Sequence, residues 1–151
     1  MTQNDNKEVH DYDAIKKDCI FCKLVRGDIP SGKVYEDDDT FAFLDSFPTA
    51  KGHVLVVPKE HYENIYSFPA ETAARVMITV QKLAVAVKNS MDADGVNIVM
   101  NNESAAGQII WHGHIHIIPR YNDDGGYIDK KKEVYIGNEM QEIAEKVKAE
   151  L

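Results

Sequence analysis

One amphipathic stripe places the strongest limit on the fold of this chain. Between residues 69 and 92, apolar side chains recur at the helical spacing i, i+4, i+7, i+8 and i+11, which predicts a long helix with one buried face. Ser67 is the predicted N-cap, and Pro69 suits the first turn of the helix. The stripe consists of Val76, Val80, Leu83, Ala84 and Val87.

Short β-rich runs lie on both sides of this helix. The pattern predicts strands at residues 34–36, 40–44, 53–57, 95–101 and 109–119, the third stopped by Pro58 and the fifth by Pro119. A closing helix begins near Asn138 and carries Met140, Ile143 and Val147 on one side. One long helix after the third of five strands predicts an α+β fold with a mainly antiparallel sheet.

Length and charge limit the classes of protein that fit. The 151 residues suit one domain, expected at residues 19–151, behind a polar flexible leader at residues 1–18. With 17 basic and 25 acidic residues, the net charge of −8 repels a polyphosphate backbone and argues against long nucleic acid as a partner. No signal peptide is visible, and no apolar run approaches the ~20 residues of a membrane span. These absences favour the cytoplasm and no membrane partner.

Three of the six histidines alternate along the fifth predicted strand, as His112, His114 and His116. On a strand these side chains share a face, but at ~3.3 Å per residue the outer two lie about 13 Å apart, too far to meet one metal ion easily. Imidazole is neutral and nucleophilic near neutral pH. The row therefore favours one histidine as a nucleophile beside another that moves a proton, with an exposed polar stripe as the alternative.

Cys19 and Cys22 are the two cysteines of the chain, and their spacing allows three interpretations. A redox pair is disfavoured because no βαβ pattern surrounds it. Two buried thiols would also be compatible with the sequence. A structural zinc site would need two further nitrogen or sulfur ligands to complete a tetrahedron.

The motif His112-Gly-His114-Ile-His116-Ile-Ile, preceded by Gly107-Gln108 and followed by Pro119-Arg120, resembles that of the histidine-triad (HIT) proteins. The likeness is to the Hint-like and bacterial Hit-like branch, and it extends upstream through "CIFCKLVRGDIPSGKVYEDDDTFAFLD" and "KGHVLVVPKEHYENI" to cover about residues 19–121. Gly113 departs from the motif, since the family usually has an apolar side chain there. The resemblance implies a HIT-like fold.

The resemblance also implies an activity and the residues that perform it. The activity is that of a purine nucleotide hydrolase or transferase, acting on a nucleoside phosphoramidate, an adenylate or a dinucleoside polyphosphate through a covalent nucleotidyl-histidine. His114 matches the nucleophile, His116 matches the histidine that contacts phosphate and helps the leaving group, and Asp45 matches the acid that holds the ribose hydroxyls. The other implied substrate-binding residues are Ile20, Phe21, Phe43, Leu44, Asn101, Gly107, Gln108 and Ile110.

Two further expectations come from the same branch. In its zinc-bearing members, a Cys-x-x-Cys pair is joined by the histidine of a "PKEH" segment and by the first histidine of the triad. The implied ligands of a structural zinc are thus Cys19, Cys22, His61 and His112. Homodimers are typical of the branch, with the 69–92 helix and the adjoining strand edge as contacts.

Two positions leave questions open. His53 matches a histidine in the outer shell of the site, although a satisfied strand-edge histidine is an equal alternative. Ile109 stands where many Hint-like proteins have a serine or threonine hydroxyl, which leaves the preferred leaving group undecided. A nucleotide-binding interaction or regulatory module with incidental catalysis is therefore a second hypothesis, and a metallohydrolase is a third.

Overall fold

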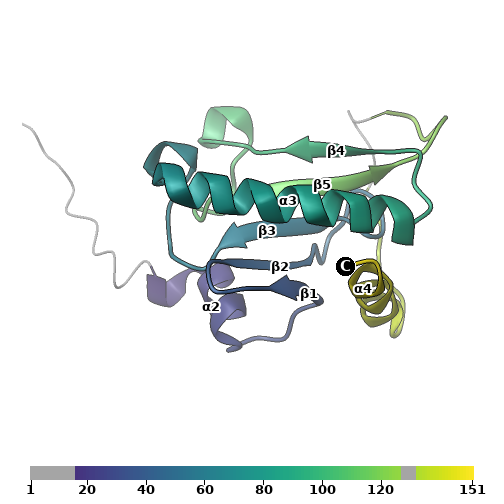
Figure 1. The fold of residues 1–151 in the computed structure, drawn as a ribbon, viewed down its shortest axis with the longest axis horizontal. Coiled ribbons are helices and arrows are strands. Elements are labelled where there is room, and N and C mark those ends of the chain that lie inside the picture. Colours follow the sequence, from purple (N-terminus) through teal and green to yellow (C-terminus); the bar gives the residue numbers. More distant parts are fainter. Residues whose placement is uncertain (1–15, 127–131) are drawn as a thin grey trace, which may run out of the picture.

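The structure is a computed structural model, and it describes residues 16–126 and 132–151. Its centre is a sheet of five strands in the order β1-β2-β3-β5-β4, with every neighbouring pair antiparallel (Figure 1). The predicted α+β class with an antiparallel sheet is confirmed. The strands are β1 (Lys33–Glu36), β2 (Thr40–Leu44), β3 (Val54–Pro58), β4 (Gly95–Val99) and β5 (Ile115–Arg120).

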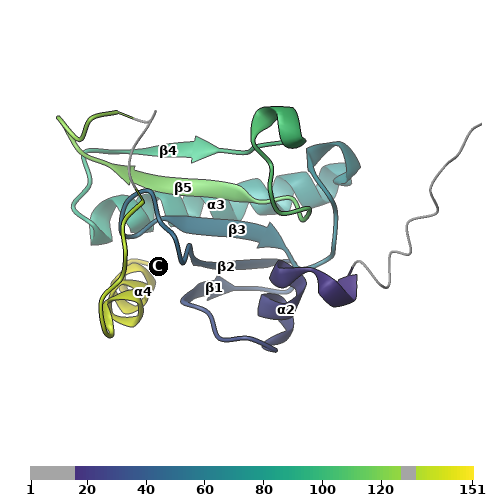
Figure 2. The same ribbon diagram turned by 180° about the vertical axis from the view of Figure 1, so that it is seen from behind.

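Helices cover both faces of the sheet. The long helix α3 (Ala70–Ser90) crosses one face, and α4 (Glu139–Ala149) packs beside it against β1 and β2. The short helix α2 (Ile20–Arg26) lies on the opposite face, which Figure 2 shows from behind. None of the helices in the described parts of the chain combines the length and apolar character needed to cross a membrane.

Strand alternation divides the interior into two cores. Ala42 and Leu44 of β2 point toward α3 and α4, whereas Phe41 and Phe43 point toward α2. The neighbouring strand β3 divides in the same way, because Phe43 pairs with Leu55 in the register of the two strands. Burial of each such side chain contributes about 1.5–3 kcal/mol, so both faces stabilise the sheet. The smaller core, under α2, forms the floor of the cavity described below.

The start of the fifth strand differs from the prediction. Strand β5 begins at Ile115, and residues 109–114 lie outside any strand, with bends at residues 110–112. Gln108 explains part of the difference, because its side-chain amide donates to the carbonyls of Glu63 and Ile110 and its oxygen accepts from Glu103 N. Backbone groups that would otherwise need a strand partner are thus satisfied within the loop.

Three other expectations about element boundaries were incomplete or wrong. Pro119 does not stop β5, which continues to Arg120, because β5 has already lost β3 as a partner beyond Ile117. Ser67 is not the cap of α3; it ends a short 3₁₀ helix (Ile65–Ser67), and Pro69 occupies the cap position without a side-chain bond. The helix α2 was not predicted, because seven residues are too few for a periodic pattern.

Packing explains why residue 113 is a glycine in this structure. A Cβ atom at this position would lie 2.6 Å from Cε1 of Phe68, far inside van der Waals contact. The Phe68 ring, which packs against the core under α3 and edge-on to Tyr62, fills the space that a side chain at residue 113 would need. The departure from the usual motif is therefore matched by an aromatic ring from a different segment.

Candidate functional site

A cavity of about 460 Å³ lies on the α2 side of the sheet. Its walls come from α2, from the ends of β2 and β3, from the loop that precedes β5, and from the segment that follows residue 131. Nine of the eleven residues predicted to be catalytic or substrate-binding line it: Ile20, Phe21, Phe43, Asp45, Asn101, Gly107, Ile110, His114 and His116.

His114 presents an unprotonated nitrogen to this cavity. Its Nδ1 lies 2.7 Å from the backbone oxygen of His112, and because a carbonyl only accepts, Nδ1 carries the proton. The lone pair is therefore on Nε2. Burial lowers the pKa of His114 below its usual value, so the ring is neutral at neutral pH. The edge of the Phe21 ring holds the imidazole from the side, with ring centroids 5.1 Å apart.

A chain of hydrogen bonds assigns the opposite tautomer to His116. The backbone N–H of Thr49 donates to Nδ1 of His53 (3.2 Å), so the proton of His53 is on Nε2. That Nε2 donates to Nδ1 of His116 (2.9 Å), which leaves the proton of His116 on Nε2. Asp45 Oδ2 lies 3.7 Å from His53 Nδ1, but this nitrogen already accepts a bond and the contact is no hydrogen bond.

Burial keeps both histidines of this hydrogen-bonded series, His53 and His116, neutral. It lowers the pKa of His53 to about 3, with smaller contributions from electrostatic interaction with His116 and Lys132. Burial, followed by the charges of His114 and Lys132, lowers the pKa of His116 to about 4. For Asp45 the effect has the other sign, since burial outweighs the bond from Phe47 N and raises the carboxyl pKa. The ring centroids of His114 and His116 lie 5.0 Å apart. His114 therefore offers a lone pair on Nε2 beside an Nε2–H of His116.

His112 faces away from this pair. It is fully buried, and its Nε2 donates to the carbonyl of Pro58 (2.8 Å), which leaves the Nδ1 lone pair toward the cysteines. Nδ1 lies 3.6 Å from Cys19 Sγ and 3.5 Å from Cys22 Sγ, while Cys22 Sγ is 3.3 Å from His61 Nδ1. One donor atom from each of these four residues lies within 4.8 Å of the others.

The two thiols differ in acidity. Burial raises the pKa of the Cys19 thiol, but the neighbouring His112 and His61 side chains and a backbone hydrogen bond at Cys22 outweigh burial and lower the pKa. Burial and the negative charge of Cys19 raise the pKa of Cys22. Nε2 of the neighbouring His61 is buried without a hydrogen-bond partner among the described residues. A site of two thiols and two imidazole lone pairs has the donor set that structural zinc takes.

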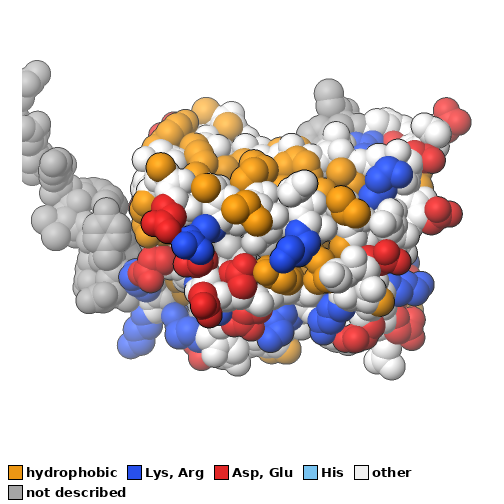
Figure 3. All heavy atoms as spheres, viewed as in Figure 1, with side chains coloured by type: hydrophobic (Ala, Val, Ile, Leu, Met, Phe, Trp, Pro, Cys, Tyr) orange, Lys and Arg blue, Asp and Glu red, His pale blue; other side chains and the backbone are white. Residues whose placement is uncertain are grey.

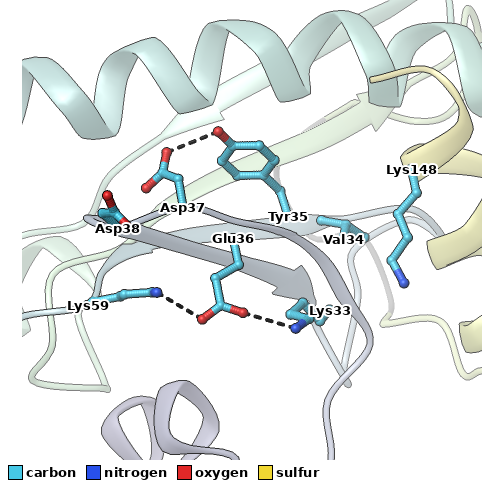
Figure 4. Close-up of a pocket in the computed structure, with 8 residues that line it drawn as sticks. All are labelled: Lys33, Val34, Tyr35, Glu36, Asp37, Asp38, Lys59 and Lys148. Carbon is cyan, nitrogen blue, oxygen red and sulfur yellow. Dashed lines mark hydrogen bonds and ion pairs between the residues drawn. The ribbon is translucent and has the colours of Figure 1, made fainter.

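A second hollow on the far side of β1 has no comparable chemistry. Figure 4 shows Glu36 between Lys33 and Lys59, each at 2.9 Å, and Tyr35 donating to Asp37 at 3.0 Å. Opposite charges here pair with one another at an open surface. Neither a histidine nor a cysteine is among its described lining residues.

Comparison with known proteins gives this arrangement a family. Residues 26–123 match the HIT domain. The chain belongs to the HIT family. A crystal structure of a Hit-like protein from Bartonella henselae is similar to this fold with a TM-score of 0.81 and 41% identity, covering 89% of this chain and 98% of the other. A zinc-bound HIT protein from Mycobacterium smegmatis matches with a TM-score of 0.79 and 33% identity, covering 89% and 94%.

Three curated HIT proteins illustrate the relatives. The protein named hit from Bacillus subtilis is 48% identical over 74% of this chain and 77% of its own length. An adenylylsulfatase of Arabidopsis thaliana is 41% identical over 73% of this chain and 56% of its own length. An adenosine 5′-monophosphoramidase of Candida albicans is 34% identical over 88% and 91%.

Two residues of the HIT motifs do not reach the cavity with their side chains. Leu44 was predicted to bind substrate, but strand alternation turns it into the core under α3, where it is almost fully buried. Gln108 was predicted to bind substrate, yet its side chain is hydrogen-bonded to the backbones of Glu63, Glu103 and Ile110. The expectation that His112, His114 and His116 share a strand face was also wrong, because β5 starts after His114.

Six lining residues were not predicted as part of this HIT site. Leu55 carried a signal, since strand alternation pairs it with Phe43 on the same face. Ile109 was noted for its missing hydroxyl, and it lies at the rim with 83% of its surface exposed. The others, which no local pattern marks, are Leu24, Ser46, Phe47 and Lys132.

The neutral state of His53 predicts a pH-dependent stability. In the unfolded chain its pKa is about 6.5, and folding lowers it to about 3. Between these values the unfolded state binds more protons, so the free energy of unfolding decreases as pH falls from 6.5 toward 3, by up to about 1.4 kcal/mol per pH unit for one histidine. His53→Gln keeps a donor and an acceptor but does not titrate, and should flatten the slope by that amount in denaturant titrations.

The range above pH 7 is the internal control, because His53 is neutral there in both states. The two proteins should have parallel stability curves above pH 7 and diverging slopes below pH 6. Equal slopes at pH 4–6 would contradict a neutral, buried His53.

Proposed function

We propose that this chain is a purine nucleotide hydrolase or transferase that forms a covalent nucleotidyl intermediate on His114. The observation that carries the proposal is the pair of assigned protons: an unprotonated Nε2 on His114 beside an N–H on His116. The adenylylsulfatase and the phosphoramidase among the relatives support the same reaction class. Substrates would be nucleoside phosphoramidates, adenylates or dinucleoside polyphosphates.

The geometry suits a displacement in two steps. The lone pair of His114 Nε2 attacks the α-phosphorus while the bond to the leaving group breaks, and water later breaks the nitrogen–phosphorus bond. The bond from His114 Nδ1–H to the His112 carbonyl stabilises the positive charge that the ring gains on attack. His116 Nε2–H donates to a phosphate oxygen. Splitting one difficult displacement in this way is the purpose of a covalent intermediate.

The rest of the cavity suits a nucleoside. Phe21 and Phe43 meet edge-on, with centroids 5.3 Å apart, and with Leu24 and Leu55 they offer an apolar surface for a flat purine. Asp45 keeps one carboxylate oxygen bonded to Phe47 N, so the other is available to accept from ribose hydroxyls. This polar group at the edge of an apolar slot is what a riboside requires.

A nucleotide-binding module without catalytic purpose is the second candidate. Ile109 favours it, because a hydroxyl near the leaving group is missing. The hydrogen-bonded chain from Thr49 through His53 to His116 favours catalysis instead, since simple binding of a nucleotide needs no fixed tautomer.

The intermediate gives the first test of this function. After incubation with adenosine 5′-phosphoramidate, intact-mass and peptide mass spectrometry under non-acidic conditions should find an adenylyl group on the peptide that contains His114. His114→Ala should lose the adduct and reduce turnover by three orders of magnitude or more, because the nucleophile is gone.

His116→Ala is the matched control, since it retains the nucleophile and should still form the adduct, more slowly. An adduct on His112 or His116 in the wild-type protein would refute the assignment. Retained AMP binding by His114→Ala with no adduct in any protein would favour the binding module.

We also propose that Cys19, Cys22, His61 and His112 hold a structural zinc ion. In a tetrahedral site with usual bond lengths, sulfur and nitrogen ligands lie about 3.5 Å apart. Three of the four sulfur–nitrogen distances here are 3.3–3.6 Å, and all four ligand atoms lie within 4.8 Å of one another. The bond from His112 to Pro58 O presents the correct nitrogen, and four protein ligands leave no position for substrate. The ion would fasten α2 to the loop that carries His114.

Zinc should be present at one equivalent per chain in protein purified without chelator, by elemental analysis. Removing it should lower the melting temperature, because the ion links residues about 90 positions apart in sequence. Cys19→Ser should reproduce the lower melting temperature, and the fraction that stays folded should keep most of its turnover. A melting temperature unchanged by a strong chelator would leave the cysteines as buried thiols.

A homodimer is the third part of the proposal. Helix α3 exposes Met77, Ile78 and Val85, and the edge strand β4 exposes Ile98. Figure 3 shows hydrophobic side chains gathered over α3 on this face. Among the described strands, β4 has a neighbour on one side only, so its outer edge can pair with a second copy. An apolar helix face beside a free strand edge is the kind of surface that a symmetric dimer buries.

Sedimentation velocity at micromolar concentration should therefore find a dimer. Ile78→Glu should shift the protein to monomer, because the charge would be buried at the contact. Val134→Glu, an exposed apolar residue away from α3 and β4, is the matched control and should leave the dimer intact. A monomeric wild-type protein would contradict this part of the proposal.

A further inference from the structure

Lys132 lines the cavity that holds the histidines, although it lies outside every motif of the sequence. Among the described lining residues it is the one cationic side chain, and Asp45 is the one carboxylate. Within residues 16–126 and 132–151, the Lys132 ammonium forms no ion pair; its bond is to the neutral hydroxyl of Thr49, at 3.2 Å. The charge of Lys132 also acts to lower the pKa of Asp45, less strongly than burial raises it, but no described carboxylate lies within ion-pair distance of the ammonium. A cation outside any described ion pair is thus positioned at a pocket that suits a nucleotide.

The backbone on the C-terminal side of Lys132 is held in place. Glu133 N donates to the carbonyl of Pro48 (2.8 Å), and the Glu133 carboxylate accepts from Lys51 N (2.9 Å). Two residues further on, the hydroxyl of Tyr135 accepts from Gly52 N (3.3 Å). These three bonds fix the segment on the loop between β2 and β3, so the approach of Lys132 to the cavity is built into the fold.

The ammonium lies toward the His116 side of the pocket. Its partner Thr49 donates through its backbone N–H to His53, which in turn donates to His116. One carboxylate oxygen of Asp45 and one ring nitrogen each of His53 and His116 lie within 4.8 Å of one another. The charge of Lys132 helps to lower the pKa of His53 and His116, after the larger effect of burial.

We propose that Lys132 binds an anionic leaving group, so that this chain prefers nucleotides joined through oxygen to sulfate or phosphate over nucleoside phosphoramidates. This inference rests on the proposed function and names its substrate class. His114 Nε2 forms the bond to the α-phosphorus, the phosphorus–oxygen bond breaks, and its electron pair departs with the sulfate or phosphate beside the ammonium. Water then attacks phosphorus, the nitrogen–phosphorus bond returns its pair to Nε2, and a proton is released.

Two features of the pocket disfavour an amine as the leaving group. An amine must gain a proton as it departs, whereas sulfate and phosphate are stable as anions. His116 is neutral at neutral pH, since burial, followed by the charges of His114 and Lys132, lowers its pKa to about 4. Ile109 supplies no hydroxyl to relay a proton. The charge of Lys132, in contrast, is matched to an oxyanion and gives a charge-assisted contact.

The test compares two leaving groups on the same nucleotide. For wild-type protein and Lys132→Met, kcat/KM is measured with adenosine 5′-phosphosulfate and with adenosine 5′-phosphoramidate. Lys132→Met should lose tenfold or more with the phosphosulfate, the worth of one charge-assisted bond, and less than threefold with the phosphoramidate. Lys132→Arg should retain most of the preference. Lys33→Met, which removes the same charge at the far hollow (Figure 4), should leave both rates unchanged.

A binding experiment separates this inference from the proposed function. In the His114→Ala background, where no covalent step occurs, calorimetry compares ADP with AMP, because the β-phosphate stands in for an anionic leaving group. Lys132→Met in that background should weaken ADP about tenfold and AMP much less. Equal losses for both ligands, or equal losses for both substrates, would overturn the role of Lys132. Absence of turnover together with selective loss of ADP binding would refute the catalytic function but retain the anion site.

Discussion

Three contacts of His112 connect the two halves of the site. Its backbone oxygen accepts from His114 Nδ1, its ring Nε2 donates to Pro58 O at the end of β3, and its remaining nitrogen faces Cys19 and Cys22. The first contact decides which nitrogen of His114 is free, and the second decides which nitrogen of His112 faces the sulfur atoms. Displacement of this buried ring would therefore disturb both the tautomer of His114 and the position of α2.

Helix α2 joins the two halves from the other direction. Cys19 and Cys22 turn toward His112 and His61, while Phe21, which precedes Cys22, turns toward Phe43 and His114. One short helix thus brings ligand atoms to one side and an aromatic wall to the other. Because α2 buries few side chains of its own, its position depends on the contacts at both sides rather than on helical propensity.

Much of this arrangement is visible in the sequence where local periodicity governs it. The α3 stripe, the run at 40–44 and the spacing of the cysteines and histidines specify local geometry, and the structure has the helix, the strand and the four-residue cluster. Leu44 differs from its predicted role because residue alternation turns it to the opposite face of the sheet from Phe43.

Long-range contacts explain what could not be predicted. Lys132 approaches Thr49 across 83 positions of sequence, from a segment without regular structure, so no local pattern marks it. The irregular backbone at 109–114 depends on the Gln108 side chain meeting Glu63, 45 positions away. In each case a side chain satisfies a distant polar group, and hydrophobic periodicity carries no information about such a pairing.

The contact between Gly113 and Phe68 limits the order in which this protein can evolve. A larger residue at 113 would collide with the ring, and a smaller residue at 68 alone would leave the space beside Gly113 unfilled, which is destabilising. Each substitution alone is unfavourable. When both residues change, the side chain at residue 113 fills the space that the Phe68 ring fills now. Relatives of this protein are therefore expected either to keep both residues or to change both. The residue at position 68 should then indicate whether position 113 of the histidine motif is glycine.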